Sequence, residues 1–395
     1  MQYNFDKVID RFHTASVKWD EQEKLFGQKD LLPLWVADMD FQLPAPVLEA
    51  MRARVDHGIF GYTERPESYY EAVIGWMQRR HGWQIQKEWI CYCPGVVPAL
   101  SYLVQSFTKP GEKVMIQPPV YPPFSGVVTA NGREVVENPL KYEDGRLTMD
   151  FDDMRSKMDP DVKLFILCNP HNPGGRVWTR EELTELGNIC MENNVMVISD
   201  EIHGDLVLKG HTHIPFASIS EEFAQHSIVC TAPSKTFNMA GLQTSNIIIA
   251  NEEWRNAFQH TLNILSLRLT NTFGVVATES AYRYGDEWLD QLLEYLQGNL
   301  AFLTSFIESR IPKIKVVQPE ATYLVWLDCR ELGMDEKSLQ RFLLTQAKVA
   351  VNQGYTFGQG GEQFIRLNIA CPRSILEEGL KRIEQAVNSL QSVAN

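Results

Sequence analysis

Lys235 lies in the stretch CTAPSKTFNMAGLQ, just beyond a short apolar run and among residues that favour turns. A lysine in a loop is usually a solvated surface charge. The alternative is a nucleophilic amine, held at the end of a strand, that forms a Schiff base with a carbonyl cofactor. The other residues of this chain that could do chemistry decide between these two interpretations.

Three further polar clusters lie beside apolar runs, and each also has a purely structural interpretation. CNPHNPGG follows LFIL, SDEIHGD follows VMVI, and GVVPAL opens a predicted helix with Pro98 in its first turn. Taken singly, the first could be only a turn, Asp200 a helix cap, His203 a buried polar residue, and the last only the start of a helix. Taken in order, all of them fit one cofactor site.

Pyridoxal 5′-phosphate requires the residue types that these clusters contain. A carboxylate must keep its pyridine nitrogen protonated, and Asp200 can supply that charge. The amide of Asn172 can donate a hydrogen bond to the phenolic oxygen of the ring. The aromatic side chain of Tyr121, in QPPVYPPF, can stack on the ring. The aldehyde then needs an amine, which is Lys235.

The phosphate of this cofactor needs backbone N–H groups at the N-terminus of a helix. Gly95, Val96 and Val97, in GVVPAL, can offer three such groups. One cofactor therefore accounts for every cluster.

An alternation of apolar runs and helices, from about residue 110, predicts the sheet that positions these clusters. Strands are expected in EKVMIQ, REVVENP, VKLFILCNP, NVMVISDE, HSIVCTAP and SNIIIA. Between the third and the fourth, TREELTELGNICMENN predicts an amphipathic helix that opens with a capping box of Thr179 and Glu182. Such a pattern indicates a mainly parallel sheet covered by helices on both faces. Ligands bind outside the carboxyl ends of such strands.

The C-terminal part has a different character. ATYLVWLDC and QFIRLNIA predict strands, and SILEEGLKRIEQAVNSL predicts an amphipathic helix capped by Ser374 with Glu377. We therefore predict an α/β protein in which residues 51–288 form a large cofactor-binding domain and residues 289–395 a small α+β domain. Residues 1–50 are expected to associate with the small domain. The helical stretch WLDQLLEYLQGNLAFLTSFIESR is the expected hinge.

The composition limits the class of partner and the compartment. The chain has 395 residues and a formal net charge of −13, which argues against nucleic acid or an anionic membrane surface as the main partner. No apolar run reaches membrane-spanning length, and the charged start MQYNFDKVIDRFH does not resemble a secretory signal. The seven cysteines are odd in number and form no CxxC pair. We expect no metal site and a reduced, cytoplasmic protein.

The motifs NPHNPGG, SDEIHGDL and APSKTFNMAGLQ, in this order, resemble fold-type I pyridoxal-phosphate enzymes of the aspartate aminotransferase superfamily. SVKWD, LPLWVADMDF, HGIFGYT and FILCNPHNPGGR also resemble its carbon–sulfur β-lyase branch, the MalY/PatB-type cystathionine β-lyases and cystalysin-like enzymes. The resemblance runs from about residue 4 to about residue 390. It implies a seven-stranded-type sheet and an α,β-elimination that turns L-cystathionine or related S-substituted L-cysteines into a thiol, pyruvate and ammonia.

The resemblance also implies roles for three more residues. Arg366, in QFIRLNIA, resembles the arginine that binds the substrate's α-carboxylate, a contact that Asn172 could share. The turn around Ala37, in WVADMDF, resembles a segment that closes over the substrate with a backbone N–H. Tyr62, in GIFGYTERP, resembles a tyrosine that reaches the phosphate of the neighbouring subunit. This last likeness implies a homodimer with shared active sites.

Two positions depart from the pattern of the aminotransferases, and both suit the lyase branch. Gln243 stands where those enzymes commonly have an arginine on the phosphate, so backbone amides and hydroxyls such as that of Ser234 must bind it. His203 stands where they tend to have a tyrosine. A hydrogen bond to the ring region and a structural role beside Asp200 both fit this histidine.

Two alternative functions remain open from the sequence. An aminotransferase would use the same residues, and a cofactor-bearing regulator could act by binding another protein. The preferred substrate among cystathionine, cystine, cysteine and S-alkyl cysteines is also open, because the leaving-group pocket has no readable motif.

Overall fold

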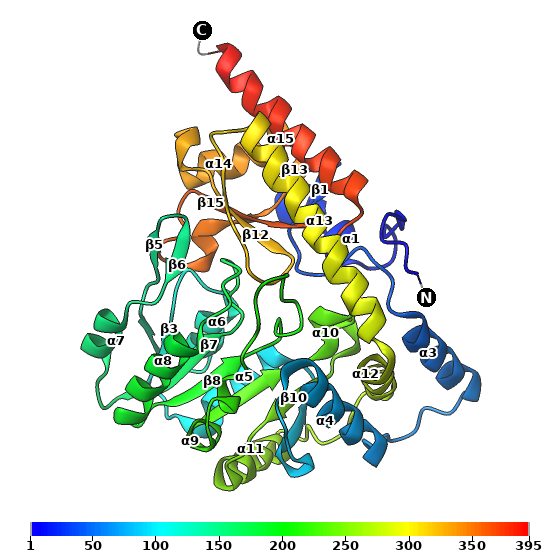
Figure 1. Cartoon of the computed structure of the whole chain (residues 1–395), viewed down its shortest axis with the longest axis vertical. Coiled ribbons are helices and arrows are strands. Elements are labelled where there is room, and N and C mark those ends of the chain that lie inside the picture. Colours follow the sequence, from blue (N-terminus) through cyan, green and yellow to red (C-terminus); the bar gives the residue numbers. More distant parts are fainter. Residues whose placement is uncertain (1, 394–395) are drawn as a thin grey trace.

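A seven-stranded sheet forms the centre of the computed structural model, which describes residues 2–393. The strand order is β2-β10-β9-β8-β7-β3-β4, and only β10 runs antiparallel to its neighbours. The predicted α/β class with a mainly parallel sheet is therefore confirmed (Figure 1). The strands are β2 (Ile90–Cys93), β3 (Lys113–Ile116), β4 (Glu134–Glu137), β7 (Val162–Cys168), β8 (Met196–Asp200), β9 (Ser227–Thr231) and β10 (Ser245–Ile248).

The six strands expected from the apolar runs are all present, whereas β2 was not predicted. Its four residues, ICYC, are all buried but show no alternation that would mark a strand. A small hairpin of β5 (Lys141–Glu143) and β6 (Arg146–Thr148) was also missed. In β7 six of the seven residues are buried, as expected for a central strand covered on both faces.

Helices cover this sheet, and two of them begin where the sequence predicts. In α8 the hydroxyl of Thr179 accepts a hydrogen bond from the N–H of Glu182, whose carboxylate accepts one from Thr179, so the capping box is confirmed. Helix α5 begins directly after Gly95, as GVVPAL indicates. The helices are α4 (Glu67–His81), α5 (Val96–Phe107), α6 (Pro123–Ala130), α7 (Phe151–Lys157), α8 (Arg180–Glu192), α9 (Glu221–Gln225), α10 (Pro233–Thr236), α11 (Glu252–Ile264) and α12 (Thr272–Tyr284).

The C-terminal part contains an antiparallel sheet of order β11-β12-β15-β14. Its strands are β11 (Lys315–Val317), β12 (Leu324–Asp328), β14 (Asn352–Gln353) and β15 (Phe364–Asn368), and its shorter helix is α14 (Glu336–Phe342). Helix α15 (Arg373–Val393) lies along the long helix α13 (Asp286–Arg310), red beside yellow in Figure 1. Both predicted strands and the predicted helix are present.

The predicted cap of α15 at Ser374 is wrong. The helix begins at Arg373, so Ser374 lies inside its first turn. The carbonyl of Pro372, the residue directly before the helix, accepts hydrogen bonds from the N–H groups of Ile375 and Leu376, so the helical pattern starts one position before Ser374 could cap it.

The N-terminal segment contacts both parts of the molecule. Its strand β1 (Leu32–Pro33) pairs with β13 (Val349–Ala350) of the C-terminal part. Its helix α3 (Ala45–His57) instead packs against α12, and the short helices α1 (Val17–Asp20) and α2 (Gln22–Phe26) precede β1. We keep the division into residues 1–50, 51–288 and 289–395 as a proposal, in which α13 crosses the second boundary.

Among the helices of residues 2–393, none has both the length and the apolar character that crossing a membrane requires.

Candidate active site

A cavity of about 360 Å³ lies where β7, β8 and β9 end at their carboxyl sides. Ten predicted site residues line it: Ala37, Gly95, Val96, Val97, Tyr121, Asn172, Asp200, His203, Ser234 and Lys235. They converge because parallel strands end at one edge of the sheet. The sequence reasoning missed several other lining residues, among them Cys168, Ile202, Ala240 and Thr244. Ile202 and Ala240 have no polar group that could signal a site, whereas the thiol of Cys168 and the hydroxyl of Thr244 stand directly beside the motifs already singled out.

Lys235 lies in α10, the short helix that follows β9, and its side chain is partly buried. Its Nζ donates a hydrogen bond of 2.7 Å to the carbonyl of Ala37. Burial, together with the positive charge of Arg366, lowers the pKa of Lys235 to about 8. The neutral amine, the form that a nucleophile or a general base requires, is therefore far more populated near physiological pH than in an ordinary lysine.

Asp200 ends β8 and is buried beneath the cavity. One carboxylate oxygen accepts a hydrogen bond of 3.1 Å from the N–H of Ile202. Burial raises the pKa of Asp200 to about 7, because so little surrounds the carboxylate to replace its hydration. A cation in the cavity would restore the ionised form, so this residue fits a protonated pyridine nitrogen.

His203 is buried beside Asp200, and burial holds the pKa of its imidazole well below the usual range. The ring is therefore neutral. Its Nδ1 has no hydrogen-bond partner among residues 2–393. A buried polar atom without a partner is costly, and a bound group in the adjoining cavity could satisfy it. The two interpretations of this histidine both stay open.

The N-terminus of α5 provides the expected place for a phosphate. Gly95 precedes the helix, and the first N–H groups of the helix have no partner within it. A Cβ at Gly95 would meet the ring of Pro98 at 3.3 Å, so glycine suits this close approach. Ser234 and Gln243 line the same cavity. A guanidinium is absent at position 243, as the sequence indicates.

Arg366 is buried in β15 and bonded to a residue of the cavity lining. Its Nη1 donates to Oδ1 of Asn172 at 2.9 Å, and its Nη2 donates to Oδ1 of Asn352 at 2.6 Å. Its Nε has no partner among residues 2–393, and burial lowers its pKa to about 10. The sequence reasoning missed Asn352, which lies opposite Arg366 in the register of β14 and β15. No signal in a two-residue strand could have revealed it.

Tyr62 does not line the cavity of its own chain. It lies between α3 and α4, and its side chain is 93% exposed. Its expected contact with the phosphate of a neighbouring subunit stays a prediction.

A model of the family described as aminotransferase class I and II matches residues 29–383. The chain is 50% identical to cystathionine beta-lyase PatB of Bacillus subtilis, over 98% of this chain and 100% of PatB. It is 34% identical to protein MalY of Escherichia coli, again over 98% and 100%. The crystal structure of cystalysin from Treponema denticola, which contains a pyridoxal 5′-phosphate cofactor, superimposes with a TM-score of 0.96. Its identity is 39%, over 99% of this chain and 100% of cystalysin.

This chain is a member of the aminotransferase class I and II family, and its resemblance to the carbon–sulfur β-lyase branch is confirmed. Pyridoxal 5′-phosphate, the predicted cofactor, fits the cavity on three counts. The cavity holds an amine of lowered pKa, a buried carboxylate in need of a cation, and the unsatisfied N-terminus of a helix.

Proposed function

We propose that this protein is a pyridoxal-phosphate-dependent carbon–sulfur β-lyase. Its substrates are L-cystathionine or related S-substituted L-cysteines, and its products are a thiol, pyruvate and ammonia. The observation that carries the proposal is a single cavity that contains both Lys235 and Asp200, with Arg366 bonded to Asn172 in the cavity wall. The names of the 50% and 34% identical relatives and of cystalysin support the same branch.

When bound, the cofactor supplies an aldehyde that condenses with amines and a pyridine ring that accepts the electron pair of a broken Cα–H bond. Asp200 would hold the proton of the ring nitrogen, and Asn172 would donate to the phenolic oxygen. Tyr121 would cover one face of the ring. The N–H groups at the start of α5, with the hydroxyl of Ser234, would bind the phosphate.

Three groups of the chain would act on the substrate. Arg366 would bind the α-carboxylate through its guanidinium, and the N–H of Ala37 would close over it. Lys235, as a neutral amine, would remove the proton from Cα and return it to the sulfur that leaves from Cβ. One water molecule is consumed, since the three-carbon fragment ends as pyruvate and ammonia.

The test of this function is the release of thiol and pyruvate from cystathionine, cystine, cysteine and S-alkyl cysteines, without an added keto acid. We expect stoichiometric thiol and pyruvate from at least one of them. An aminotransferase would instead give a keto-acid-dependent half-reaction and no pyruvate from cystathionine, and that result would contradict the lyase proposal.

We also propose a homodimer with shared sites, in which Tyr62 binds the phosphate of the neighbouring subunit. The support is a set of exposed apolar side chains on two segments, the one that carries Tyr62 and the one that spans the end of α11. Ile59 and Phe60, before it, are 67% and 52% exposed, and Ile264 and Leu269, near the end of α11, are 69% and 55% exposed. Contiguous exposed apolar side chains typically mark an interface.

The segment of Tyr62 is packed against residues 270–273, which directly follow Leu269 in the chain. The rings of Phe60 and Phe273 lie 5.6 Å apart, and the hydroxyls of Thr63 and Thr272 are 2.6 Å apart. A second copy of the chain, placed on these segments, would bury the apolar side chains next to Tyr62. A cytoplasmic location completes the proposal. Its support is that all seven cysteines are buried as free thiols.

A further inference from the structure

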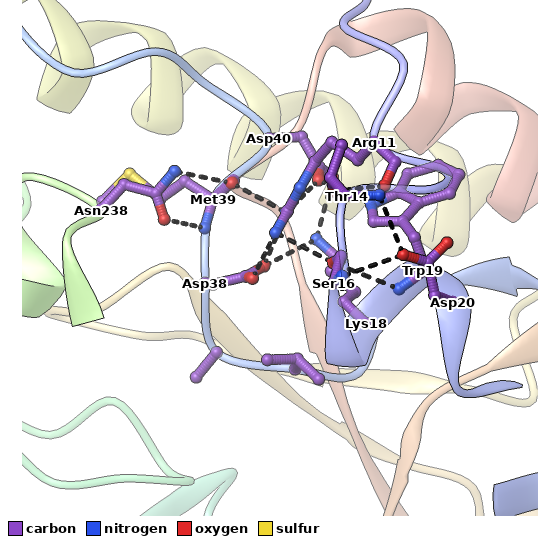
Figure 2. Close-up of polar contacts among 12 residues, drawn as sticks. Arg11, Thr14, Ser16, Lys18, Trp19, Asp20, Asp38, Met39, Asp40 and Asn238 are labelled. Atoms are coloured by element: carbon purple, nitrogen blue, oxygen red, sulfur yellow. Dashed lines mark hydrogen bonds and ion pairs between the residues drawn. The ribbon is translucent and has the colours of Figure 1, made fainter. Parts of the chain in front are cut away.

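Four charged side chains form a cluster beside the turn at Ala37, and the proposed reaction does not use them. We call Arg11, Lys18, Asp38 and Asp40 the Lys18 cluster (Figure 2). The side chain of Lys18 is 0% exposed, and its Nζ lies 2.8 Å from Asp40 and 3.5 Å from Asp38. Arg11 contacts the same two carboxylates, each at 2.7 Å. Two cations therefore balance two anions in a mostly buried site.

The Lys18 cluster holds the backbone of residues 35–41, the segment WVADMDF. Arg11 Nη1 donates to the carbonyl of Met39 at 3.1 Å, and the indole N–H of Trp35 donates to the carbonyl of Lys18 at 3.3 Å. The N–H of Asp40 is bonded to the carbonyl of Ala370 at 2.9 Å. The segment has no helix or strand of its own, so two side-chain bonds and one backbone bond to a distant residue take the place of a regular backbone pattern.

Two asparagines connect this segment to the elements that carry Lys235 and Arg366. Asn238, three positions after Lys235, bonds to the N–H and the carbonyl of Met39 at 2.9 and 2.8 Å, as Figure 2 shows. Asn368, two positions after Arg366, donates to the carbonyls of Val36 and Asp38, both at 2.6 Å. The segment thus lies between the turn that carries the lysine and the strand that carries the arginine.

The carbonyl of Ala37 projects from this segment toward the site. It accepts hydrogen bonds from Lys235 Nζ at 2.7 Å and from the hydroxyl of Tyr323 at 2.9 Å. Burial and Arg366 lower the pKa of Lys235, whereas the charges of Asp38 and Asp200 raise it. The segment therefore presents two features that favour the protonated amine, a carbonyl acceptor and a carboxylate.

We propose that the Lys18 cluster is a positioning device that fixes the Ala37 carbonyl as the acceptor for the protonated amine of Lys235. In the proposed lyase reaction, on which this inference rests, that amine carries a proton between Cα and the leaving sulfur. The four members of the cluster do not touch the reacting atoms, so they position the segment and are not catalytic residues.

The chemistry of the cluster favours positioning over simple stability. A buried ion pair is weak evidence for stability, because apolar residues of similar volume often hold a fold as well. Ion pairs with several hydrogen bonds do impose direction, since each carboxylate oxygen must meet its donor. Asp40 Oδ1 accepts from both Arg11 and Trp19, while its Oδ2 meets Lys18. This arrangement favours the observed orientation of the segment, because each oxygen of Asp40 already has its donor.

The test compares Lys18→Met and Asp38→Asn with the control Lys24→Met. Lys24 is a nearby lysine of α2, also paired with a carboxylate, but its side chain is 76% exposed. Two measurements are made on the holoenzyme: amide hydrogen exchange of residues 35–41, and kcat and KM for the substrate of the wild type. A third uses the full-length cofactor-free protein, in which the pH dependence of Lys235 acylation, followed by peptide mass spectrometry, gives the pKa of the amine.

We expect Lys18→Met to exchange faster at residues 35–41 and to lose kcat by about 100-fold, the effect of a small misplacement of a reacting group, with KM nearly unchanged. Asp38→Asn should lower the acylation midpoint of Lys235, because a charge that favours the ammonium is removed. The control should match the wild type in all three measurements.

A Lys18→Met protein with a lower melting temperature but wild-type exchange and kcat would overturn the inference. If Lys18→Met does not fold, Asp38→Asn tests the inference instead. This variant should fold, because Asp38 is partly exposed and the amide of the new asparagine keeps one acceptor oxygen. An unchanged acylation midpoint of Lys235 and an unchanged kcat in Asp38→Asn would also contradict the inference. A wild-type protein without lyase activity contradicts the proposed function alone, since the exchange and acylation measurements need no substrate.

Discussion

Arg366 Nη1 lies 2.9 Å from Oδ1 of Asn172, although 194 positions separate the two residues. The bond joins the antiparallel sheet of the C-terminal part to the loop after β7. Because the amide oxygen is engaged by the guanidinium, the NH₂ group of Asn172 remains as the donor toward the cavity. One contact thus orients the residue proposed for the phenolic oxygen and holds the residue proposed for the substrate's carboxylate.

Asp200→Ala and Arg366→Ala should impair different properties of the enzyme. Loss of Asp200 removes the counter-charge of the ring, so both cofactor affinity and turnover should fall. Loss of Arg366 should lower kcat/KM by an amount that corresponds to about 2–3 kcal/mol of lost transition-state stabilisation. The absorbance of the bound cofactor should stay unchanged. Cofactor titrations and steady-state kinetics measure both effects. Arg330→Ala is a control, since this 51% exposed arginine is paired with Asp328.

Cofactor loss in Arg366→Ala together with cofactor retention in Asp200→Ala would mean that the two roles are reversed.

Lys235 should carry the cofactor covalently. Borohydride treatment of the purified yellow protein should attach the cofactor to the peptide that contains Lys235, because only an amine in the cavity can meet the aldehyde. Lys235→Ala should lose turnover and could still bind the cofactor without a covalent bond. Lys209→Ala, at an exposed position, should behave like the wild type. A labelled peptide with any other lysine would contradict the assignment.

The raised pKa of Asp200 predicts a pH dependence of stability in the cofactor-free protein. The pKa of Asp200 is about 7 in the folded state and has its ordinary value of 3.8 in the unfolded state, so between these pH values the folded state binds more protons than the unfolded state. The stability from this group is complete below pH 3.8 and is lost as the pH rises through 7, by roughly 4 kcal/mol. Denaturant unfolding across this range, compared with Asp200→Asn, should show the loss in the wild type only. If the unfolding free energies of the wild type and of Asp200→Asn had the same dependence on pH, the prediction would be contradicted.

Tyr62→Phe should weaken cofactor retention by about 1.5–3 kcal/mol, the value of a hydrogen bond to a charged group. Tyr284→Phe, which changes another exposed tyrosine, 62% accessible, should have no effect. Equilibrium dialysis of the cofactor measures both.

Mixing inactive variants at Tyr62 and Lys235 should also restore part of the activity, because a hybrid dimer contains one site free of both changes. Absence of recovery, when subunits demonstrably exchange, would rule out the shared site.

Most of the cavity could be predicted from the chain order alone. Lys235, Asp200 and Asn172 each follow closely on an apolar run that forms a strand of the central sheet, so their meeting at one edge is a consequence of parallel pairing. The cap at Thr179 is equally local, because both of its hydrogen bonds lie within four residues. Ser374 shows the limit of such local signals, since the same pattern placed the start of α15 at the wrong residue.

Contacts across long stretches of chain depended on the tertiary structure. The reversed direction of β10 has no signature in its apolar residues, and Asn352 meets Arg366 only through the register of two strands. Lys18 likewise finds Asp40 because the N-terminal segment folds back on itself beside the C-terminal part. The type of a charged side chain predicts the kind of partner that it needs, but not which residue of the chain will lie next to it. That choice is made when the whole chain packs, because the apolar core fixes the strands and turns from which the partners project.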